Sequence, residues 1–321
     1  MLVAEWEHQA CLKDTQIKIN SEFKIIKKYL SGIGAAYLNS NGVELTGGDD
    51  CAVLAAKAKL LISTDTSVAG IHFLKSMQPH AIAYRAVSTA LSDIAAMGGV
   101  PTAFNLSLVI PTFDPSWMKD FRKGLIKISK EHKIPLIGGD LVKGPLQISV
   151  TVLGQPGRKI LLRSGAKHGD ILCLSGVLGQ AYMGLKEFKS SSLINAQTKP
   201  YLFPKAQVGY AQAIAPYATA AIDVSDGIFQ DLSHLIDQSN IGCELDLEQV
   251  PVVDSLYQKQ CLEFGDDYQL LFTVPPNKLA LLQSKIKSMG KKCHTIGVMK
   301  GTRLKILNNP FKTIKNWDHF R

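Results

Sequence analysis

The chain has 321 residues, 46% of them hydrophobic and 20% charged, a composition typical of a globular protein and a length that allows two domains. Its net charge of +9 is spread over predicted helix faces without interleaved aromatic residues, which argues against nucleic-acid binding and suits a small polyanionic ligand. No apolar run reaches the ~20 residues of a membrane span, and six scattered cysteines without a C-x-x-C pair argue against a zinc site or a disulfide framework, so we expect a cytoplasmic protein.

Residues 21–155 are predicted to form an N-terminal domain, preceded by an N-terminal extension at residues 1–20. The extension mixes both charge signs and lacks the apolar core of an export signal. Proline near the start of the two long helical stretches, and glycine after the first of them, mark helix ends. The expected elements are a helix from residue 21, strands at 51–56 and 59–65, a helix at 79–97, a strand at 103–110, a helix at 115–133 and strands at 135–140 and 146–154.

Residues 160–321 are predicted to form a second domain after a linker, GQPGRK at 154–159, in which turn-forming residues cluster. The stretch 189–204 is interpreted as irregular. Because strands and helices mix without strict alternation, we expect two α/β (α+β) domains rather than one doubly wound sheet. The expected elements are a strand at 170–176, helices at 178–188 and 205–218, a strand at 220–225, a helix at 227–239, strands at 242–247 and 267–275, and a helix at 277–290.

Aspartates recur at the ends of predicted strands. Asp65 ends a strand whose last residues, Ser63, Thr64 and Thr66, also carry side-chain oxygens, whereas a strand that only had to stop would end more simply in glycine or asparagine. The other acidic residues in such settings are Asp49 and Asp50 after Gly47-Gly48, Asp140 after Gly138-Gly139, and Asp223 and Asp226 in AIDVSDG. Each alone is typical of a turn or a helix cap, but their recurrence favours a phosphate-handling site with several metal ions over a chance set of turns.

Asp93 differs from these aspartates because it lies inside the predicted helix 79–97. Its neighbours on the same helix face include Thr89, Ala90 and Met97. An ionised carboxylate among such side chains is costly unless a cation or a donor neutralises it, and lysine and arginine are nearly absent from these turns. A divalent cation that prefers oxygen ligands, such as Mg²⁺, is the simplest partner.

Other common motifs for nucleotide binding or catalysis are missing from the sequence. There is no G-x-x-x-x-G-K-[ST], no G-x-G-x-x-G between a strand and a helix, no G-x-S-x-G and no H-E-x-x-H. The spacing of Gly176 and Gly179 could bring backbone N–H groups to a phosphate, although this pattern alone is weak. His72, just after the oxygen-rich strand end, suits either a buried structural histidine or a ligand.

Seven sequence blocks occur in an order that is highly specific. They are GGDDCAVL, ISTDTSVAGIHF, ALSDIAAMGGVP, LIGGDLVKGPLQISVTVLG, RSGAKHGD, AIDVSDGIFQDLSH and GDDYQLLFTVP. From about residue 21 to the C-terminus, the chain resembles the thiamine-monophosphate kinase family, whose superfamily includes aminoimidazole ribonucleotide synthetase and selenophosphate synthetase. The resemblance implies a two-domain fold of the aminoimidazole-ribonucleotide-synthetase type, in which the N-terminal sheets of two subunits pair into a barrel.

The resemblance also implies an activity, namely ATP-dependent phosphorylation of thiamine monophosphate to thiamine diphosphate by a homodimer that binds ATP and several Mg²⁺ ions. The family's metal positions correspond to Asp50, Ser63, Thr64, Asp65, Asp93, Asp140, Asp223 and Asp226. Its ATP contacts correspond to Gly139, Asp140, Arg163 and Ser225, and its contacts with thiamine phosphate to His72, Asp266 and Trp317. Because the acceptor phosphate is already anionic, we expect direct transfer assisted by metal, without a catalytic nucleophile or a strong general base.

Three features depart from the family pattern. GDDYQ stands where the family usually has G-E-D-Y-E, GGDLVKG stands where it has G-G-D-T-T-x-G, and residues 1–20 have no counterpart. The first change affects the expected contact between Asp266 and the substrate. The second change, at Leu141 and Val142, removes two hydroxyl groups beside Asp140 and so affects the expected nucleotide or metal contact there.

Two alternative functions stay open at this point. One is another ATP-dependent synthesis of the superfamily, of the selenophosphate or aminoimidazole ribonucleotide type. The selenium enzyme has a reactive cysteine in a glycine-rich stretch, a setting that Cys11 lacks. The other alternative is a non-catalytic subunit that binds nucleotide or metal, and the full set of carboxylates argues against it.

Overall fold

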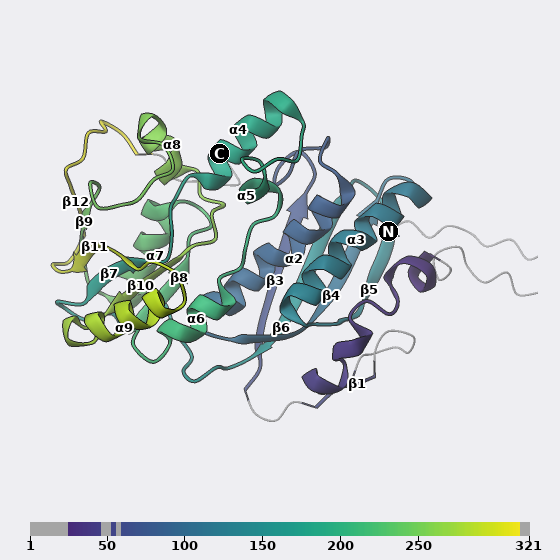
Figure 1. The fold of residues 1–321 in the computed structure, drawn as a ribbon, viewed down its shortest axis with the longest axis horizontal. Helices are drawn as coiled ribbons and strands as arrows, with labels where there is room; N and C mark the ends of the chain where they lie inside the picture. Colours follow the sequence, from purple (N-terminus) through teal and green to yellow (C-terminus); the bar gives the residue numbers. More distant parts are fainter. Residues whose placement is uncertain (1–24, 46–52, 56–58, 315–321) are drawn as a thin grey trace, which may run out of the picture.

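The computed structural model describes residues 25–45, 53–55 and 59–314. Within them the chain forms two halves, each with helices on its own main sheet, that lie side by side (Figure 1). The predicted α/β class and the two-domain architecture are confirmed. Among the residues so described, no helix has both the length and the apolar character that crossing a bilayer requires.

The N-terminal half contains η1 (Ile26–Leu30), η2 (Ala35–Tyr37), η3 (Asn39–Asn41), β1 (Val43–Leu45), β2 (Val53–Leu54), β3 (Leu61–Val68), α2 (Pro79–Ala96), β4 (Val100–Ile110), α3 (Pro115–His132), β5 (Leu136–Lys143) and β6 (Gln147–Gln155). Its main sheet has the strand order β3-β6-β4-β5. Only the β4–β5 pair in this sheet is parallel. The helices α2 and α3 pack together on one face of the sheet (Figure 1).

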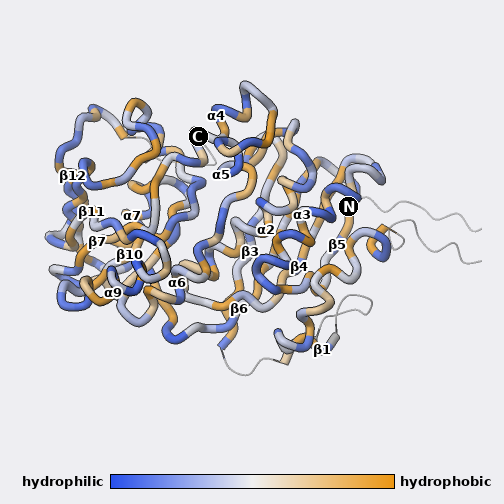
Figure 2. The backbone as a smooth tube through the Cα atoms, in the orientation of Figure 1, coloured by the Kyte–Doolittle hydropathy of each residue, from blue (hydrophilic) through white to orange (hydrophobic). Residues whose placement is uncertain are grey.

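The helix α3 shows how the local sequence sets an element. Pro115 stands in its first turn, where a missing N–H costs no helix hydrogen bond, and the Asp114 carboxylate accepts a hydrogen bond from the Ser116 N–H at 2.8 Å. Lys133, with a φ of 56°, ends the helix. Buried residues recur three or four positions apart, at Met118, Phe121, Leu125 and Ile128. Figure 2 shows hydrophobic and hydrophilic segments alternating along this helix, as expected for one that covers a sheet.

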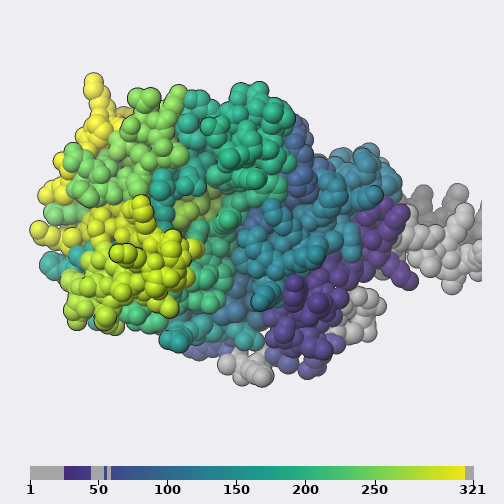
Figure 3. All heavy atoms as spheres, viewed as in Figure 1, coloured from purple at the N-terminus to yellow at the C-terminus, as the bar shows by residue number. Residues whose placement is uncertain are grey.

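The segment that precedes the main sheet lies against α3. Arg122 of α3 donates a hydrogen bond to the carbonyl oxygen of Tyr29, in η1, at 2.8 Å. In the space-filling view this early segment covers the edge of the N-terminal half next to α3 (Figure 3). Only residues from 25 onward of the helix predicted to begin at residue 21 are described, and the predicted N-terminal extension lies outside the described residues.

The C-terminal half contains β7 (Ile171–Leu174), α4 (Gln180–Ser191), α5 (Lys199–Leu202), α6 (Val208–Ile214), β8 (Ala220–Asp223), α7 (Ile228–Ser239), β9 (Cys243–Asp246), η4 (Ser255–Tyr257), α8 (Gln258–Glu263), β10 (Leu270–Val274), α9 (Pro276–Ser288), β11 (His294–Met299) and β12 (Leu304–Leu307). Its strand order is β12-β9-β11-β7-β10-β8, and only the β12–β9 pair is parallel. Leu172 and Leu174 share a core with α7, whereas Cys173 shares one with α6 and α9. Successive strand residues point to opposite faces, so helices cover this sheet on both sides.

The helix α2 joins the two halves. Its large side chains, such as Tyr84 and Leu91, belong to the core beneath the N-terminal sheet. Its last turn has Ala95 and Ala96, which pack with α6 in the core of the C-terminal half. Small side chains at this contact allow the two elements to approach closely, and α2 also contacts β8. The helix α2 therefore packs against both halves of the chain.

The structure contains elements that the sequence analysis did not predict. β11 and β12 follow residue 290, after which no element was predicted, and they complete the C-terminal sheet. The stretch 189–204, predicted to be irregular, contains the short helix α5, and α8 lies in a region to which no element was assigned. These elements are short, so they carry too few turns or alternations for a periodic pattern to be recognised.

Candidate active site

A cavity of about 390 Å³ lies between the two halves of the chain. The N-terminal half contributes acidic and hydroxyl side chains from β3 and α2, including Thr64, Asp65 and Asp93. The C-terminal half contributes Asp223 and Asp226 from the end of β8 and the loop after it. Seven apolar or aromatic side chains also line the cavity, namely Ile71, Phe73, Leu74, Leu185, Tyr201, Phe264 and Tyr268. An acidic region and an aromatic region thus share one cavity.

Polar residues on α2 form a stripe along this cavity. Arg85, Thr89, Ser92 and Asp93 stand at i, i+4, i+7 and i+8 of a helix whose other side chains are mostly apolar, and this spacing places them on one face. Arg85, Thr89 and Asp93 line the cavity. The sequence analysis identified only Asp93, although the same spacing, applied to the whole helix, would have found the other three.

Three carboxylates in the acidic region of the cavity each accept a hydrogen bond from a hydroxyl group. Ser63 of β3 donates to Asp93 at 2.5 Å, and Thr89 of α2 donates to Asp65 of β3 at 2.6 Å. Ser92 of α2 donates across the boundary between the halves to Asp223 at 2.6 Å. These bonds fix the carboxylates in place before any ligand binds.

Burial and mutual repulsion disfavour the charged forms of these acids. Burial, followed by the negative charge of Asp93, raises the pKa of Asp223 to about 7, against the opposing effects of the Ser92 hydrogen bond and of Arg163. The pKa of Asp93 is raised as well, chiefly by burial and also by the charge of Asp65. Arg163 lowers the pKa of both acids, so the expectation that the chain supplies no cation near Asp93 is incomplete.

Asp223 is expected to destabilise the metal-free protein progressively as the pH rises from about 4 to about 7. These limits are the pKa of a free aspartate, near 3.9, and the raised pKa of Asp223 in the folded protein, about 7. When the folded pKa lies above the unfolded one, the stabilisation from proton binding is complete below the unfolded pKa and is lost as the pH rises through the folded pKa. In excess chelator at pH 8, Asp223→Asn is therefore expected to melt a few degrees above the wild type, with a smaller gap at pH 5.5. Equal melting of the two proteins at pH 8 would contradict this assignment.

The donor set fits Mg²⁺ that arrives together with a phosphate ligand. Carboxylate and hydroxyl oxygens are the ligands that Mg²⁺ prefers, and it usually binds one or two carboxylates along with water and substrate phosphates. In the part of the chain that the structure describes, no three His, Cys, Asp or Glu side chains converge so as to hold an ion by themselves. Asp65, Asp93, Asp223 and Asp226 line one cavity and could hold Mg²⁺ together with a bound polyphosphate.

The other predicted metal and nucleotide residues lie in several places. Ser225 lines the cavity beside Asp226, and Thr64 lines it while its hydroxyl lies 2.9 Å from that of Thr151. Arg163 is exposed, and its charge reaches Asp93 and Asp223. Asp50 lies outside the described residues, as does Trp317, predicted to contact the substrate.

Gly139 and Asp140 lie in β5, at the opposite edge of the sheet from β3, and neither lines the cavity. Asp140 is exposed, and its carboxylate accepts a hydrogen bond from the Leu141 N–H at 2.9 Å. Gly139 has a φ of 150°, and a Cβ atom there would lie 1.8 Å from the carbonyl oxygen of Leu106. Packing against β4 therefore requires glycine at this position whether or not it binds a nucleotide.

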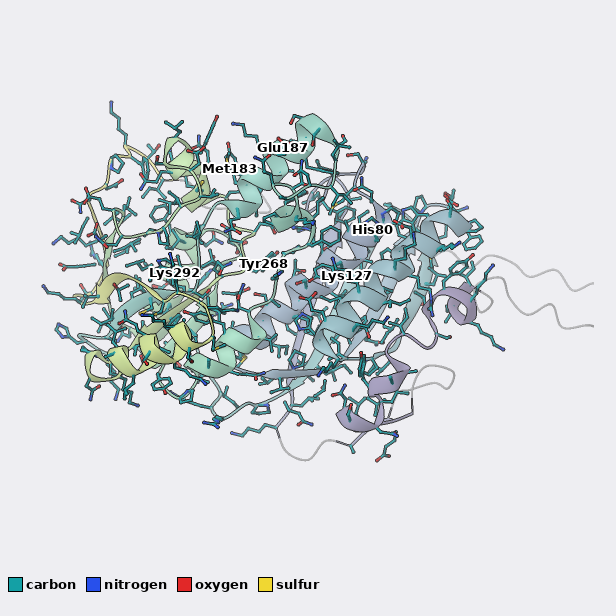
Figure 4. All side chains as sticks on the ribbon, viewed as in Figure 1. His80, Lys127, Met183, Glu187, Tyr268 and Lys292 are labelled. Carbon is teal, nitrogen blue, oxygen red and sulfur yellow. The ribbon has the colours of Figure 1, made fainter. Side chains whose placement is uncertain are left out.

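The two described residues predicted to contact the substrate, His72 and Asp266, both line the cavity. His72 Nδ1 accepts a hydrogen bond from the Val68 N–H at 3.0 Å, which fixes the ring orientation. Asp266 forms an ion pair with Arg85, a residue that the sequence analysis did not single out. Tyr268, two residues further on, lies in the region where the halves meet (Figure 4).

Two other sequence features have structural partners. The prediction that backbone N–H groups near Gly176 and Gly179 bind a phosphate is wrong. The N–H groups of Gly179 and Ala181 donate instead to the buried Asp267 carboxylate, at 2.5 and 2.9 Å. Gln269, which replaces the usual glutamate of the family, accepts a hydrogen bond from the Ser175 hydroxyl at 2.9 Å. It does not line the cavity, so this replacement leaves the lining unchanged.

Comparisons with known proteins identify related chains. The domain family described as AIR synthase related protein, N-terminal domain, matches residues 48–155, and the corresponding C-terminal domain family matches residues 155–307. A thiamine-monophosphate kinase of Buchnera aphidicola subsp. Schizaphis graminum is 36% identical over 321 residues, which cover 94% of this chain and 99% of the relative.

Solved structures show the same similarity. The thiamine-monophosphate kinase of Stenotrophomonas maltophilia K279a matches with a TM-score of 0.80 at 30% identity, covering 87% of this chain and 95% of the other. A structure described as AaThiL complexed with AMPPCP and TMP matches with a TM-score of 0.72 at 29% identity, covering 81% and 87% of the two chains.

Proposed function

The chain belongs to the thiamine-monophosphate kinase family, and from this we infer that it transfers the γ-phosphoryl group of ATP to thiamine monophosphate, giving thiamine diphosphate and ADP. One observation carries this conclusion: a cavity with an acidic and an aromatic region lies in a chain that is 36% identical to such a kinase over nearly its whole length. A related chain is described as binding AMPPCP, an ATP analogue, together with TMP, which supports one cavity for both substrates.

We propose that Asp65, Asp93, Asp223 and Asp226 bind Mg²⁺ together with the ATP phosphates. The family positions add Asp50, Ser63, Thr64 and Asp140 to the metal-binding set and give Gly139, Asp140, Arg163 and Ser225 as ATP contacts. Of these, Gly139 and Asp140 lie away from the cavity of their own chain, so we assign the metal ions chiefly to the four cavity aspartates. Bound Mg²⁺ would neutralise the phosphate groups and stabilise the charge that develops on the leaving oxygen. The chain's own contribution is to hold the carboxylates in place through Ser63, Thr89 and Ser92.

Phosphoryl transfer is direct in this proposal. The acceptor phosphate is already anionic near neutral pH, so alignment and charge neutralisation replace a general base. His72, Asp266 and Trp317 position thiamine monophosphate, and no protein side chain forms a bond to phosphorus. In this proposal the carboxylates that accept from Ser63, Thr89 and Ser92 are committed to metal ions, so they do not serve as bases that would activate these hydroxyls for attack.

Incubation with γ-labelled ATP, Mg²⁺ and thiamine monophosphate tests the activity and the direct mechanism together. Label is expected in thiamine diphosphate, and none on the protein when thiamine monophosphate is omitted. Absence of thiamine diphosphate would overturn the function, and turnover only with an acceptor of the related synthetases would favour that alternative. Protein that retains label after denaturation would overturn direct transfer.

We further propose a homodimer that forms through the uncovered face of the N-terminal sheet. The helices α2 and α3 cover one face, and the residues of β3 that point away from them include Ile62, which is 62% exposed. Val142 of β5 is 46% exposed. A second copy of the chain, pairing its sheet in a barrel as the family resemblance implies, would bury such residues. A monomeric mass in sedimentation equilibrium at micromolar concentration would contradict the proposal.

We also propose a cytoplasmic location, a boundary between domains near residues 154–159 and a separate N-terminal extension at 1–20. The cysteines of the described residues are free thiols, and Cys173, Cys243 and Cys261 among them are buried, which supports a reducing compartment. Disulfide-linked cysteines in protein purified under non-reducing conditions from its native cell would count against that location.

A further inference from the structure

Arg85, in the middle of α2, forms a buried ion pair that joins the two halves. Its side chain is 6% exposed, and Nη2 donates to both carboxylate oxygens of Asp266. Nη1 donates to the carbonyl oxygen of Tyr201 at 2.6 Å, and the guanidinium carbon lies 4.7 Å from the centroid of the Tyr201 ring. The C-terminal half thus contacts the guanidinium both at its edge and on its face, so Arg85, which itself lines the cavity, is held against Asp266.

Asp266 belongs to a turn, residues 265–268, whose backbone has an uncommon conformation. Asp266 and Tyr268 have φ values of 64° and 50°, in the left-handed region that non-glycine residues rarely adopt. The Asp266 N–H donates to the carbonyl oxygen of Ser225 at 2.8 Å, and the Tyr268 N–H to that of Val224 at 2.9 Å. Such a conformation persists where surrounding groups fix it from several sides, and the Arg85 pair supplies the fixation from the N-terminal half.

The same turn anchors the helix α4. Asp267 accepts hydrogen bonds from the N–H groups of Gly179 and Ala181, at the start of α4. Leu185 and Lys189, one and two turns further along α4, line the cavity. A change at the turn is therefore expected to move Leu185 and Lys189 as well as Asp266.

The helix α2 separates the two ends of the cavity by a fixed distance. Arg85 and Asp93 are eight residues apart, about 12 Å along the helix axis at 1.5 Å per residue. The Asp93 end carries the carboxylates proposed to bind Mg²⁺ and the ATP phosphates. The Arg85 end has Asp266 with Phe264 and Tyr268, a carboxylate beside aromatic rings, and such a group suits the cationic thiazolium ring of thiamine.

We propose that Arg85 is a positioning residue for the thiamine side of the cavity. By holding Asp266 and the turn 265–268 against α2, it sets the site for thiamine monophosphate at a fixed distance from the metal-binding carboxylates. The inference rests on the proposed function, because it takes thiamine monophosphate as the ligand. It assigns the two ends of the cavity to different substrates, so a change at Arg85 has a selective effect.

Calorimetric titrations with thiamine monophosphate and, separately, with Mg²⁺ and AMPPCP test this selectivity. Arg85→Gln is expected to weaken thiamine monophosphate binding at least tenfold and to change binding of the nucleotide analogue less than twofold. Arg85→Lys is expected to recover part of the loss, because an ammonium group restores the charge but not the paired hydrogen bonds. If Arg85 acts through Asp266, Arg85→Gln added to Asp266→Asn is expected to weaken binding less than twofold beyond Asp266→Asn alone.

Ser88→Ala is the matched control, since Ser88 also joins α2 to the C-terminal half but does not line the cavity. Its hydroxyl donates to the carbonyl oxygen of Pro204 at 2.7 Å and accepts from the Ala206 N–H at 3.3 Å. This variant is expected to lower the melting temperature while leaving both affinities unchanged. A general loosening of the two halves would instead weaken both ligands in Ser88→Ala as well as in Arg85→Gln.

The outcomes separate this inference from the proposed function. Unchanged thiamine monophosphate binding in Arg85→Gln, or equal weakening of both ligands, overturns the positioning role. If Arg85→Gln does not fold, the same titrations are made with Arg85→Lys and Asp266→Asn. Equal weakening of thiamine monophosphate and AMPPCP binding in these two variants would contradict the selective role of Arg85. Wild-type protein that binds thiamine monophosphate but forms no thiamine diphosphate overturns the kinase function, and the binding titrations still decide the role of Arg85.

Discussion

Asp93→Asn is expected to lower kcat by roughly 10³-fold, a loss of the size seen when one key electrostatic group is removed from an active site. The substitution removes a charge and keeps the shape of the side chain, so the fold should be retained. In metal-free protein it should raise the melting temperature, because the ionised Asp93 is partly buried and close to the charges of Asp65 and Asp223. Steady-state kinetics and thermal melts in chelator measure the two effects.

The matched control is Asp237→Asn, which removes the same charge from an exposed position on α7. It should change neither kcat nor the melting temperature of the metal-free protein appreciably. An Asp93→Asn variant with near-normal turnover would return Asp93 to the role of a buried helix residue that is hydrogen-bonded to Ser63.

Removal of Mg²⁺ is expected to abolish turnover and to weaken ATP binding by about 100-fold. The acidic lining of the cavity, at Asp65, Asp93, Asp223 and Asp226, repels a bare triphosphate. A net repulsion of about 3 kcal/mol, modest for several like charges at close range, corresponds to this factor. Calorimetry with ATP in excess chelator and in excess Mg²⁺ gives the comparison, and tight binding in chelator would contradict the assignment of the acidic region.

The long helices could be predicted from the sequence almost to the residue. The stretches 79–97 and 115–133 begin with proline in the first turn, and the helices are Pro79–Ala96 and Pro115–His132. Both are long enough for helix periodicity and end signals to agree. The strands β11 and β12 carry no such pattern, because they are short and find their partners in strands far away in the sequence.

The candidate site could be predicted only in part. The sequence singles out the oxygen-rich stretch 63–66 and the aspartates at and after the end of β8 as candidate ligands. The prediction that Asp65 and Asp140 end their strands is wrong, because β3 continues to Val68 and β5 to Lys143, each pairing with its neighbour over these residues. The bond from Ser92 to Asp223 and the ion pair of Arg85 with Asp266 could not be predicted, since both form only where the two halves meet. Local sequence patterns do not show which distant segments come into contact. Here that contact depends on how the small side chains at the end of α2 pack against α6.

Electron paramagnetic resonance of Mn²⁺ in the presence of AMPPCP tests most directly whether the carboxylates beside α2 hold the metal ions for phosphoryl transfer. Mn²⁺ takes the same oxygen ligands as Mg²⁺ and is visible to this method. The wild type is expected to bind more than one Mn²⁺ ion per chain with the nucleotide analogue, and Asp93→Asn at least one fewer, with Asp237→Asn unchanged. The same number and affinity of Mn²⁺ ions in the wild type and in Asp93→Asn would contradict the account.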